Sequence, residues 1–77
     1  MKRDRQMTAT EFLKDITHAQ SDFMAAKASG FYNHKTEVRI LDPLMEKYGM
    51  THDEALNCAR NRMTMQEYLR ILERRNR

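Results

Sequence analysis

The sequence predicts an all-α protein, a small bundle of three to four helices that forms a single domain over residues 7–77. One observation behind this prediction is the pattern Met-Thr-x-x-Glu-x-Leu, which begins at Met7, again at Met50 and again at Met63. Another is the scarcity of turn formers, because two Gly and one Pro in 77 residues are too few for the many tight turns of an all-β fold. A chain of this size has a small core, and such domains are often stabilised by self-association or by a partner.

Each copy of the repeated pattern is typical of a helix start. The Thr can act as N-cap, with its hydroxyl accepting from the amide of the Glu three residues later, and that Glu can accept from the Thr amide; this is the capping box. The Met before the Thr and the residue after the Glu occupy hydrophobic-staple positions, as in Met7–Phe12 and Met63–Tyr68. The pattern therefore predicts three helix starts, after residues 8, 51 and 64, and not a functional repeat.

The first helix should run from about Ala9 to Ser29 and end at Gly30, since glycine is favoured just after a helix. Its apolar residues recur in steps of three and four, which favours an amphipathic helix packed on its own domain over the alternative, a dimer seam. This stripe comprises Ala9, Phe12, Ile16, Ala19, Phe23 and Ala26, widened by Leu13 and Met24.

The second element, residues 35–48, has two interpretations because Pro43 interrupts its helical spacing. Either one helix is kinked at Pro43, or a short helix begins with Asp42 as N-cap, which leaves residues 36–41 free to form a strand. We favour the helix.

Two short helices should follow, over about 52–60 and 65–75. Gly49 ends the preceding segment, and the link between the two helices is short enough to force a sharp corner. The inner side of the third helix should carry Ala55, Leu56, Ala59 and Met63, and the stripe of the fourth should be Met65, Tyr68, Leu69 and Leu72.

The charge layout shows basic ends and a mildly acidic middle, with a net charge of +3. Residues 1–6 should form a flexible basic arm. This asymmetry hints at an anionic partner, although arginines also keep a terminal helix in water. No stretch approaches the roughly 18 apolar residues that a membrane span needs, and no apolar segment of a secretory signal follows the basic start. We expect a cytoplasmic protein with no membrane partner.

Enzymatic chemistry is not expected. The chain has no Cys-x-x-Cys, His-x-x-x-His or phosphate-cradling glycine loop. His52 and Cys58, the nearest candidate metal ligands along the chain, would lie about 600° apart around a helix and thus on different faces. Cys58 is expected to be a small buried apolar residue. The sequence thus predicts no catalytic residue, no metal, no cofactor and no small-molecule substrate.

Gly49 occupies the place of a turn glycine between two amphipathic helices. Apolar residues flank it where such helices pack on one another: Leu44, Met45, Tyr48, Met50, Ala55 and Cys58. Residues 44–60 therefore resemble the helix-turn-helix motif shared by many bacterial and phage regulators. The motif usually has Ala at the place that Met45 occupies in this chain.

The resemblance implies DNA binding through the helix that follows Gly49. Asn57 and Arg60 on that helix are suitable base readers. Asp53 and Glu54 are not suitable there, because they would repel phosphate at the helix end that faces DNA.

The function that we predict is that of a non-enzymatic helical binding protein, an accessory regulator, adaptor or inhibitor, that acts on a macromolecular partner. That partner should be another protein or a second copy of the chain. The residues expected to carry this binding are Lys14, His18, Asp22, Arg70 and Arg74. The alternative is a small DNA-binding transcriptional regulator that uses residues 44–60 with basic flanks. In that case the nucleic-acid contacts would come from Asn57, Arg60, Arg62, Arg70, Arg74 and Arg77.

Overall fold

The computed structural model describes residues 7–77, which fold into four helices without a strand. They are α1 (Ala9–Ser29), α2 (His34–Tyr48), α3 (His52–Ala59) and α4 (Met65–Arg75). None of these four helices combines the length and the apolar character that crossing a membrane requires. The all-α prediction is confirmed, and the predicted and observed bounds of each helix agree to within one residue. The basic arm predicted at residues 1–6 lies outside the described residues.

The three predicted capping boxes are present, at the starts of α1, α3 and α4. At α3, the amide of Glu54 donates to the Thr51 hydroxyl at 3.1 Å, and the Thr51 amide donates to Glu54 Oε1 at 2.9 Å. The start of α2 uses a cap that the sequence reading missed. There Asn33 Oδ1 accepts from the Thr36 amide at 2.9 Å, which satisfies one of the free amides of the first turn.

Pro43 lies inside α2, which continues as one helix on both sides of it. The strand alternative for residues 36–41 is therefore wrong. The Asn33 cap starts the helix upstream of this segment, and burying Ile40, Leu41 and Leu44 along one helical face outweighs the loss of one amide donor at the proline.

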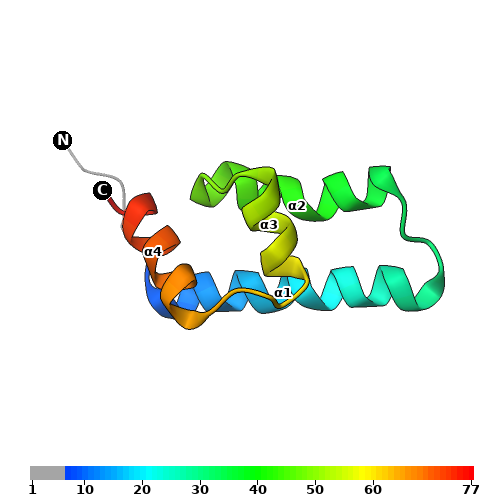
Figure 1. Cartoon of the computed structure of the whole chain (residues 1–77), viewed down its shortest axis with the longest axis horizontal. Helices are drawn as coiled ribbons and strands as arrows, with labels where there is room; N and C mark the ends of the chain where they lie inside the picture. Colours follow the sequence, from blue (N-terminus) through cyan, green and yellow to red (C-terminus); the bar gives the residue numbers. More distant parts are fainter. Residues whose placement is uncertain (1–6) are drawn as a thin grey trace.

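The helices form two layers (Figure 1). In one layer α1 and α2 run antiparallel as a long hairpin. In the other, α3 crosses the hairpin near its middle, and α4 lies across the end of the hairpin where α1 begins. Both α3 and α4 pack on α1 and on α2, but the backbones of α3 and α4 do not pack on each other. One face of the hairpin is thus covered by α3 and α4, and the opposite face is not.

A tether between the two ends of the described chain closes this arrangement. The Met7 amide donates to Asn76 Oδ1 at 2.8 Å, and Asn76 Nδ2 donates to the Met7 carbonyl at 2.9 Å. The side chain of Asn76 thus pairs with the backbone of Met7 as a strand neighbour would. This contact, 69 residues apart in sequence, holds the end of α4 against the start of α1.

One hydrophobic core lies between the layers. Five of the six predicted α1 positions are buried, while Ala9 is exposed; Leu13 and Met24 are also exposed and do not widen the stripe. Each of the four helices contributes to the core, together with the segments before α1 and α3. Its residues are Met7, Phe12, Ile16, Ala19, Phe23, Ala26, Ile40, Leu41, Leu44, Tyr48, Met50, Ala55, Cys58, Ala59, Tyr68, Ile71 and Leu72.

The predicted face of α4 requires a correction. Tyr68 and Leu72 are buried as expected, but Met65 and Leu69 are 55% and 49% exposed, and Ile71 takes the inner place. Two overlapping apolar stripes fit this helix, and periodicity alone does not choose between them. Arg74 bonds to Glu54, and Asn76, just after α4, bonds to the Met7 backbone; these contacts hold α4 with the stripe containing Ile71 on the core.

Candidate functional site

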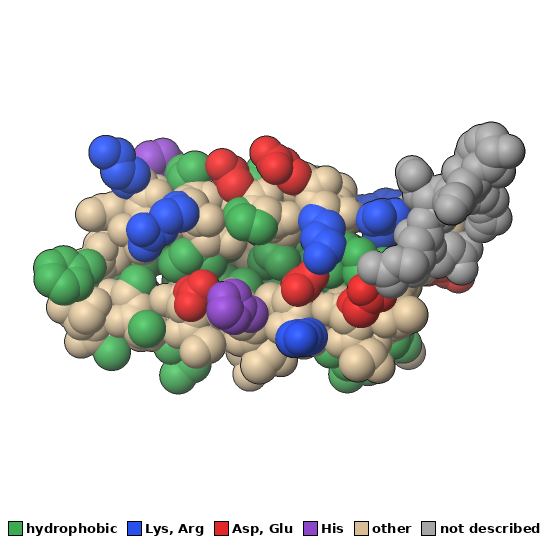
Figure 2. Space-filling view, turned by 180° about the vertical axis from the view of Figure 1, so that it is seen from behind, with side chains coloured by type: hydrophobic (Ala, Val, Ile, Leu, Met, Phe, Trp, Pro, Cys, Tyr) green, Lys and Arg blue, Asp and Glu red, His purple; other side chains and the backbone are tan. Residues whose placement is uncertain are grey.

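A groove of about 790 Å³ runs along the uncovered face of the α1–α2 hairpin. Residues of α1, of α2 and of the link between them line it, and none comes from α3 or α4. Figure 2 shows this face, with apolar side chains visible along a furrow and charged side chains on both sides of it. Five residues that line the groove also belong to the core: Ala19, Ala26, Ile40, Leu44 and Tyr48.

The two rims of the groove carry opposite charges. The α1 rim presents Asp15 and Asp22 with His18 between them, at helical steps of three and four. The α2 rim presents Arg39 and Lys47 on either side of an exposed proline. An apolar floor between an acidic rim and a basic rim is suited to the side of an amphipathic helix, which offers apolar anchors flanked by charges.

Asp15 closes one end of the groove. Its Oδ2 accepts from Lys47 Nζ at 2.7 Å and from the Tyr48 hydroxyl. Burial disfavours the ionised Asp15, but the hydrogen bonds from Lys47 and Tyr48 outweigh burial and leave its pKa below the ordinary value of 3.8. Burial, with the hydrogen bond to Asp15, raises the pKa of Tyr48, so this hydroxyl stays protonated and acts as a donor. The contacts among Asp15, Lys47 and Tyr48 fix how far α1 is shifted along its axis relative to α2.

The predicted partner-binding residues do not form one surface. His18 and Asp22 line the groove, where His18 Nε2 lies 3.5 Å from Asp22 Oδ2. Lys14 is exposed on α1 but is not among the groove residues. Arg70 and Arg74 belong to α4 on the other layer. The sequence reading missed the basic rim, Arg39 and Lys47, because the pairing of α1 with α2 is what brings it opposite the acidic one.

Arg74 has a structural role in the fold. Its Nη2 donates to Glu54 Oε1 at 2.9 Å and to the Gly49 carbonyl at 3.1 Å. Arg74 thereby links α4 to the start of α3, two elements whose backbones do not pack on each other. The hydrogen bond from Arg74, followed by that from the Thr51 amide, holds the pKa of Glu54 below its ordinary value of 4.5.

The helix-turn-helix-like segment has the turn that the sequence predicted. Gly49 adopts a left-handed conformation with φ of 67°, and the chain then enters α3 through the Thr51 cap. The buried residues of α3, which are Ala55, Cys58 and Ala59, pack on the hairpin. Asn57 and Arg60 are exposed, as the resemblance requires. Asp53 at the start of α3 is also exposed, with 95% of its side chain accessible.

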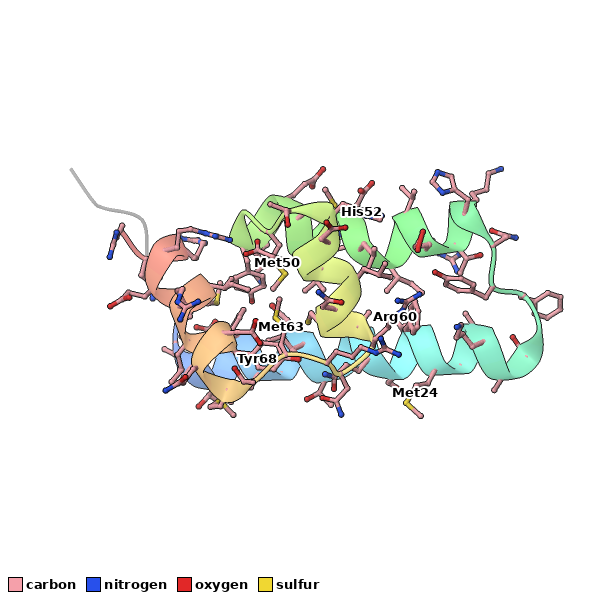
Figure 3. All side chains as sticks on the ribbon, in the orientation of Figure 1. Met24, Met50, His52, Arg60, Met63 and Tyr68 are labelled. Atoms are coloured by element: carbon pink, nitrogen blue, oxygen red, sulfur yellow. The ribbon has the colours of Figure 1, made fainter. Side chains whose placement is uncertain are left out.

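A second, smaller hollow of about 470 Å³ lies between α1 and the link from α3 to α4. Its lining includes Arg60, Arg62 and Lys27. The hollow therefore brings two of the predicted nucleic-acid-binding residues close to a lysine that was not predicted as one. Figure 3 shows Arg60 at the end of α3, close to α1, while the exposed Met24 projects from the outer edge of α1. The remaining predicted residues lie elsewhere, on α3, on α4 or at its end: Asn57, Arg70, Arg74 and Arg77.

Cys58 is fully buried, as expected for a small apolar side chain. Burial raises the pKa of its thiol to about 11, against an opposing contribution from a hydrogen bond with Tyr68. Within residues 7–77, no cluster of three or more His, Cys, Asp or Glu side chains has an arrangement that could hold a metal ion.

Comparisons with protein-family models, with curated proteins and with solved structures found no match to this chain.

Proposed function

We propose that this chain is a non-enzymatic binding protein that recruits another protein through the α1–α2 groove, and so acts as a regulator, adaptor or inhibitor. The observation that carries the proposal is an apolar furrow of about 790 Å³ on a helical face that no other part of residues 7–77 covers. Grooves between helices that expose apolar side chains are a recurring docking mode for partner helices.

Photo-crosslinking from the groove tests the proposal. A photoreactive phenylalanine analogue replaces Ala25, an exposed groove residue on α1, and in a matched control it replaces Ala28, an exposed residue of the same helix outside the groove. We expect a protein adduct from position 25 and none from position 28. The adduct is identified by mass, the partner is purified, and its affinity is measured with and without an Asp22→Arg change. Absence of any adduct at position 25, or equal adducts at both positions, would overturn the proposal.

DNA binding through α3 is the second candidate function, supported by the left-handed turn at Gly49 and by the exposure of Asn57 and Arg60. Binding to duplex DNA measured over a salt series tests it. The DNA function predicts micromolar binding that weakens steeply with salt, and Arg60→Ala should reduce the slope of log affinity against log salt by about 1 if Arg60 contacts a phosphate. No binding at low salt contradicts it. Asp53→Ala is the control, and it should strengthen DNA binding, since it removes a charge that repels phosphate.

A further inference from the structure

The rims of the α1–α2 groove are complementary to each other in charge, and this property identifies a partner. We propose that a second copy of this chain occupies the groove, with the two hairpins face to face around a twofold axis parallel to the helices. The inference rests on the proposed function, because it names the partner of the same groove.

The charges on the two rims lie at matching heights along the hairpin. Lys47 Nζ is 2.7 Å from Asp15 Oδ2, which places these two residues level with each other. Asp22 lies seven residues further along α1, about 10.5 Å at the helical rise, and Arg39 lies eight residues back along the antiparallel α2, about 12 Å. Asp22 and Arg39 therefore lie nearly level on opposite rims.

Only one of the two face-to-face symmetric arrangements pairs unlike charges. A twofold axis across the hairpin puts α1 over α1 of the partner and α2 over α2, so that acidic rims face acidic rims. A twofold axis along the hairpin puts α1 over the partner's α2 and preserves height. Asp22 then faces Arg39 of the other copy, twice per dimer. Like charges in direct opposition are costly and unlike charges set the register of an interface, so the second arrangement is selected.

The groups that this arrangement pairs are available in the single chain. Arg39 makes no hydrogen bond or ion pair with any other residue between 7 and 77. Among residues 7–77 the Asp22 side chain makes an ion pair with His18 and no other hydrogen bond or ion pair, and 54% of it is exposed. By contrast, Asp15 and Lys47 already neutralise each other within one copy, so the charge that remains for recognition is that of Asp22 and Arg39.

The floor of the groove permits close approach of a second hairpin. Ala19, Ala25 and Ala26 give α1 a small-residue surface there, facing Ile40 and Leu44 of α2. Helices with such side chains pack at the short end of the 8–10 Å range. Two facing hairpins would form a four-helix arrangement with the apolar floors of both grooves at its centre.

The expected dimer is weak. The 15-residue α2 limits the shared face to about 22 Å in length, and two helices side by side span about 20 Å, which gives about 450 Å² for each copy. The total of about 900 Å² lies slightly below the roughly 1,000 Å² expected of a stable specific interface, so we expect a transient dimer with a dissociation constant no tighter than the micromolar range.

Sedimentation equilibrium of the full chain over about 5–500 µM tests the inference through charge reversal. We expect the 9.2 kDa chain to shift from monomer to dimer across this range. Asp22→Arg alone and Arg39→Asp alone should each weaken self-association at least 10-fold, because each creates two like-charge contacts in the symmetric dimer. An equimolar mixture of the two variants should restore it, because both contacts then join unlike charges. Asp53→Arg and Arg70→Asp, exposed residues that do not line the groove, are the matched controls and should leave association unchanged.

The outcomes separate this inference from the proposed function. A monomer at every concentration, or a dimer that neither reversal weakens, overturns the second copy as the occupant. If each reversal abolishes the dimer and the mixture of the two variants does not restore it, the proposed twofold axis along the hairpin is wrong. If the chain is monomeric while position 25 crosslinks specifically to a different protein, the inference fails and the proposed function stands; if no adduct forms at position 25 in a sample that dimerises, both fail. Circular dichroism of each variant verifies that the helices are intact.

Discussion

Replacing Arg74 with methionine should destabilise the fold, although Arg74 is an exposed arginine that a charge-based reading assigns to binding. The change removes the ion pair with Glu54 and the hydrogen bond to the Gly49 carbonyl, while methionine retains most of the aliphatic stem. The Arg74 and Glu54 side chains are 46% and 29% exposed, so the pair itself contributes only about 0.2–1 kcal/mol. The bond to the carbonyl adds about 0.5–1.5 kcal/mol. We expect a loss of about 1–2 kcal/mol, or roughly 4–16 °C in Tm for a domain of this size.

Urea denaturation followed by circular dichroism measures this loss as a shift of the midpoint at constant slope. A double-mutant cycle with Glu54→Gln isolates the ion pair, because glutamine keeps the acceptor of the capping box and removes only the charge. The matched control is Arg70→Met on the same helix, which should be neutral within about 0.5 kcal/mol. If Arg74→Met were as neutral as Arg70→Met, or if Arg74 and Glu54 showed no coupling, the structural role assigned to Arg74 would be refuted.

Three further predictions concern the start of α3 and the core. Thr51→Ala should cost about 1 kcal/mol in urea denaturation, because the Glu54 amide loses its acceptor; the conservative change to Ser should not. The pKa of Glu54 is depressed in the fold, so its contribution to stability is complete above its unfolded value near 4.5 and is lost as pH falls through the lower, folded value; denaturation midpoints across acidic pH should show this loss, and Arg74→Met should reduce it. The Cys58 thiol, fully buried and with its pKa raised to about 11, should react with a disulfide reagent at pH 8 only at the rate of unfolding, and equal rates with and without urea would contradict its burial.

The parts of the fold that the sequence predicted well are those that depend on near neighbours in the chain. A capping box is complete within four residues, so the Thr and Glu of each copy sufficed to place the starts of α1, α3 and α4. Gly30 and Gly49 end helices for an equally local reason, a left-handed backbone with φ of 80° and 67°.

The parts that the sequence did not predict depend on residues far apart in the chain. The rotation of α4 is one example, because Asn76 pairs with the Met7 backbone and Arg74 with Glu54. The helical period is compatible with Leu69 or Ile71 facing inward, and these distant contacts select Ile71. No pattern within α4 carries that information.

Only one of the two rims of the candidate groove could be predicted from the sequence, for the same reason. His18 and Asp22 could be selected as an exposed polar face of α1 from their spacing alone. Arg39 and Lys47 could not be joined to them, since the ambiguity at Pro43 left open whether α2 was a helix across that region. Once α2 is continuous and antiparallel to α1, both rims follow from residue spacing.

The same long-range contact also changes the argument about DNA. From sequence, Asp53 and Glu54 both oppose phosphate at the start of α3. In the structure Arg74 neutralises Glu54 at 2.9 Å, so the repulsion that remains there comes from Asp53, while Arg74 itself is removed from the set of free cations. Two charges on α3 therefore decide how favourably it would meet DNA. Asp53 at its start repels phosphate, and Arg60 at its end attracts it. A single change, Asp53→Asn, should strengthen any DNA binding that exists without altering the core or the groove. If the protein binds DNA and this change has no effect, α3 does not face the phosphates.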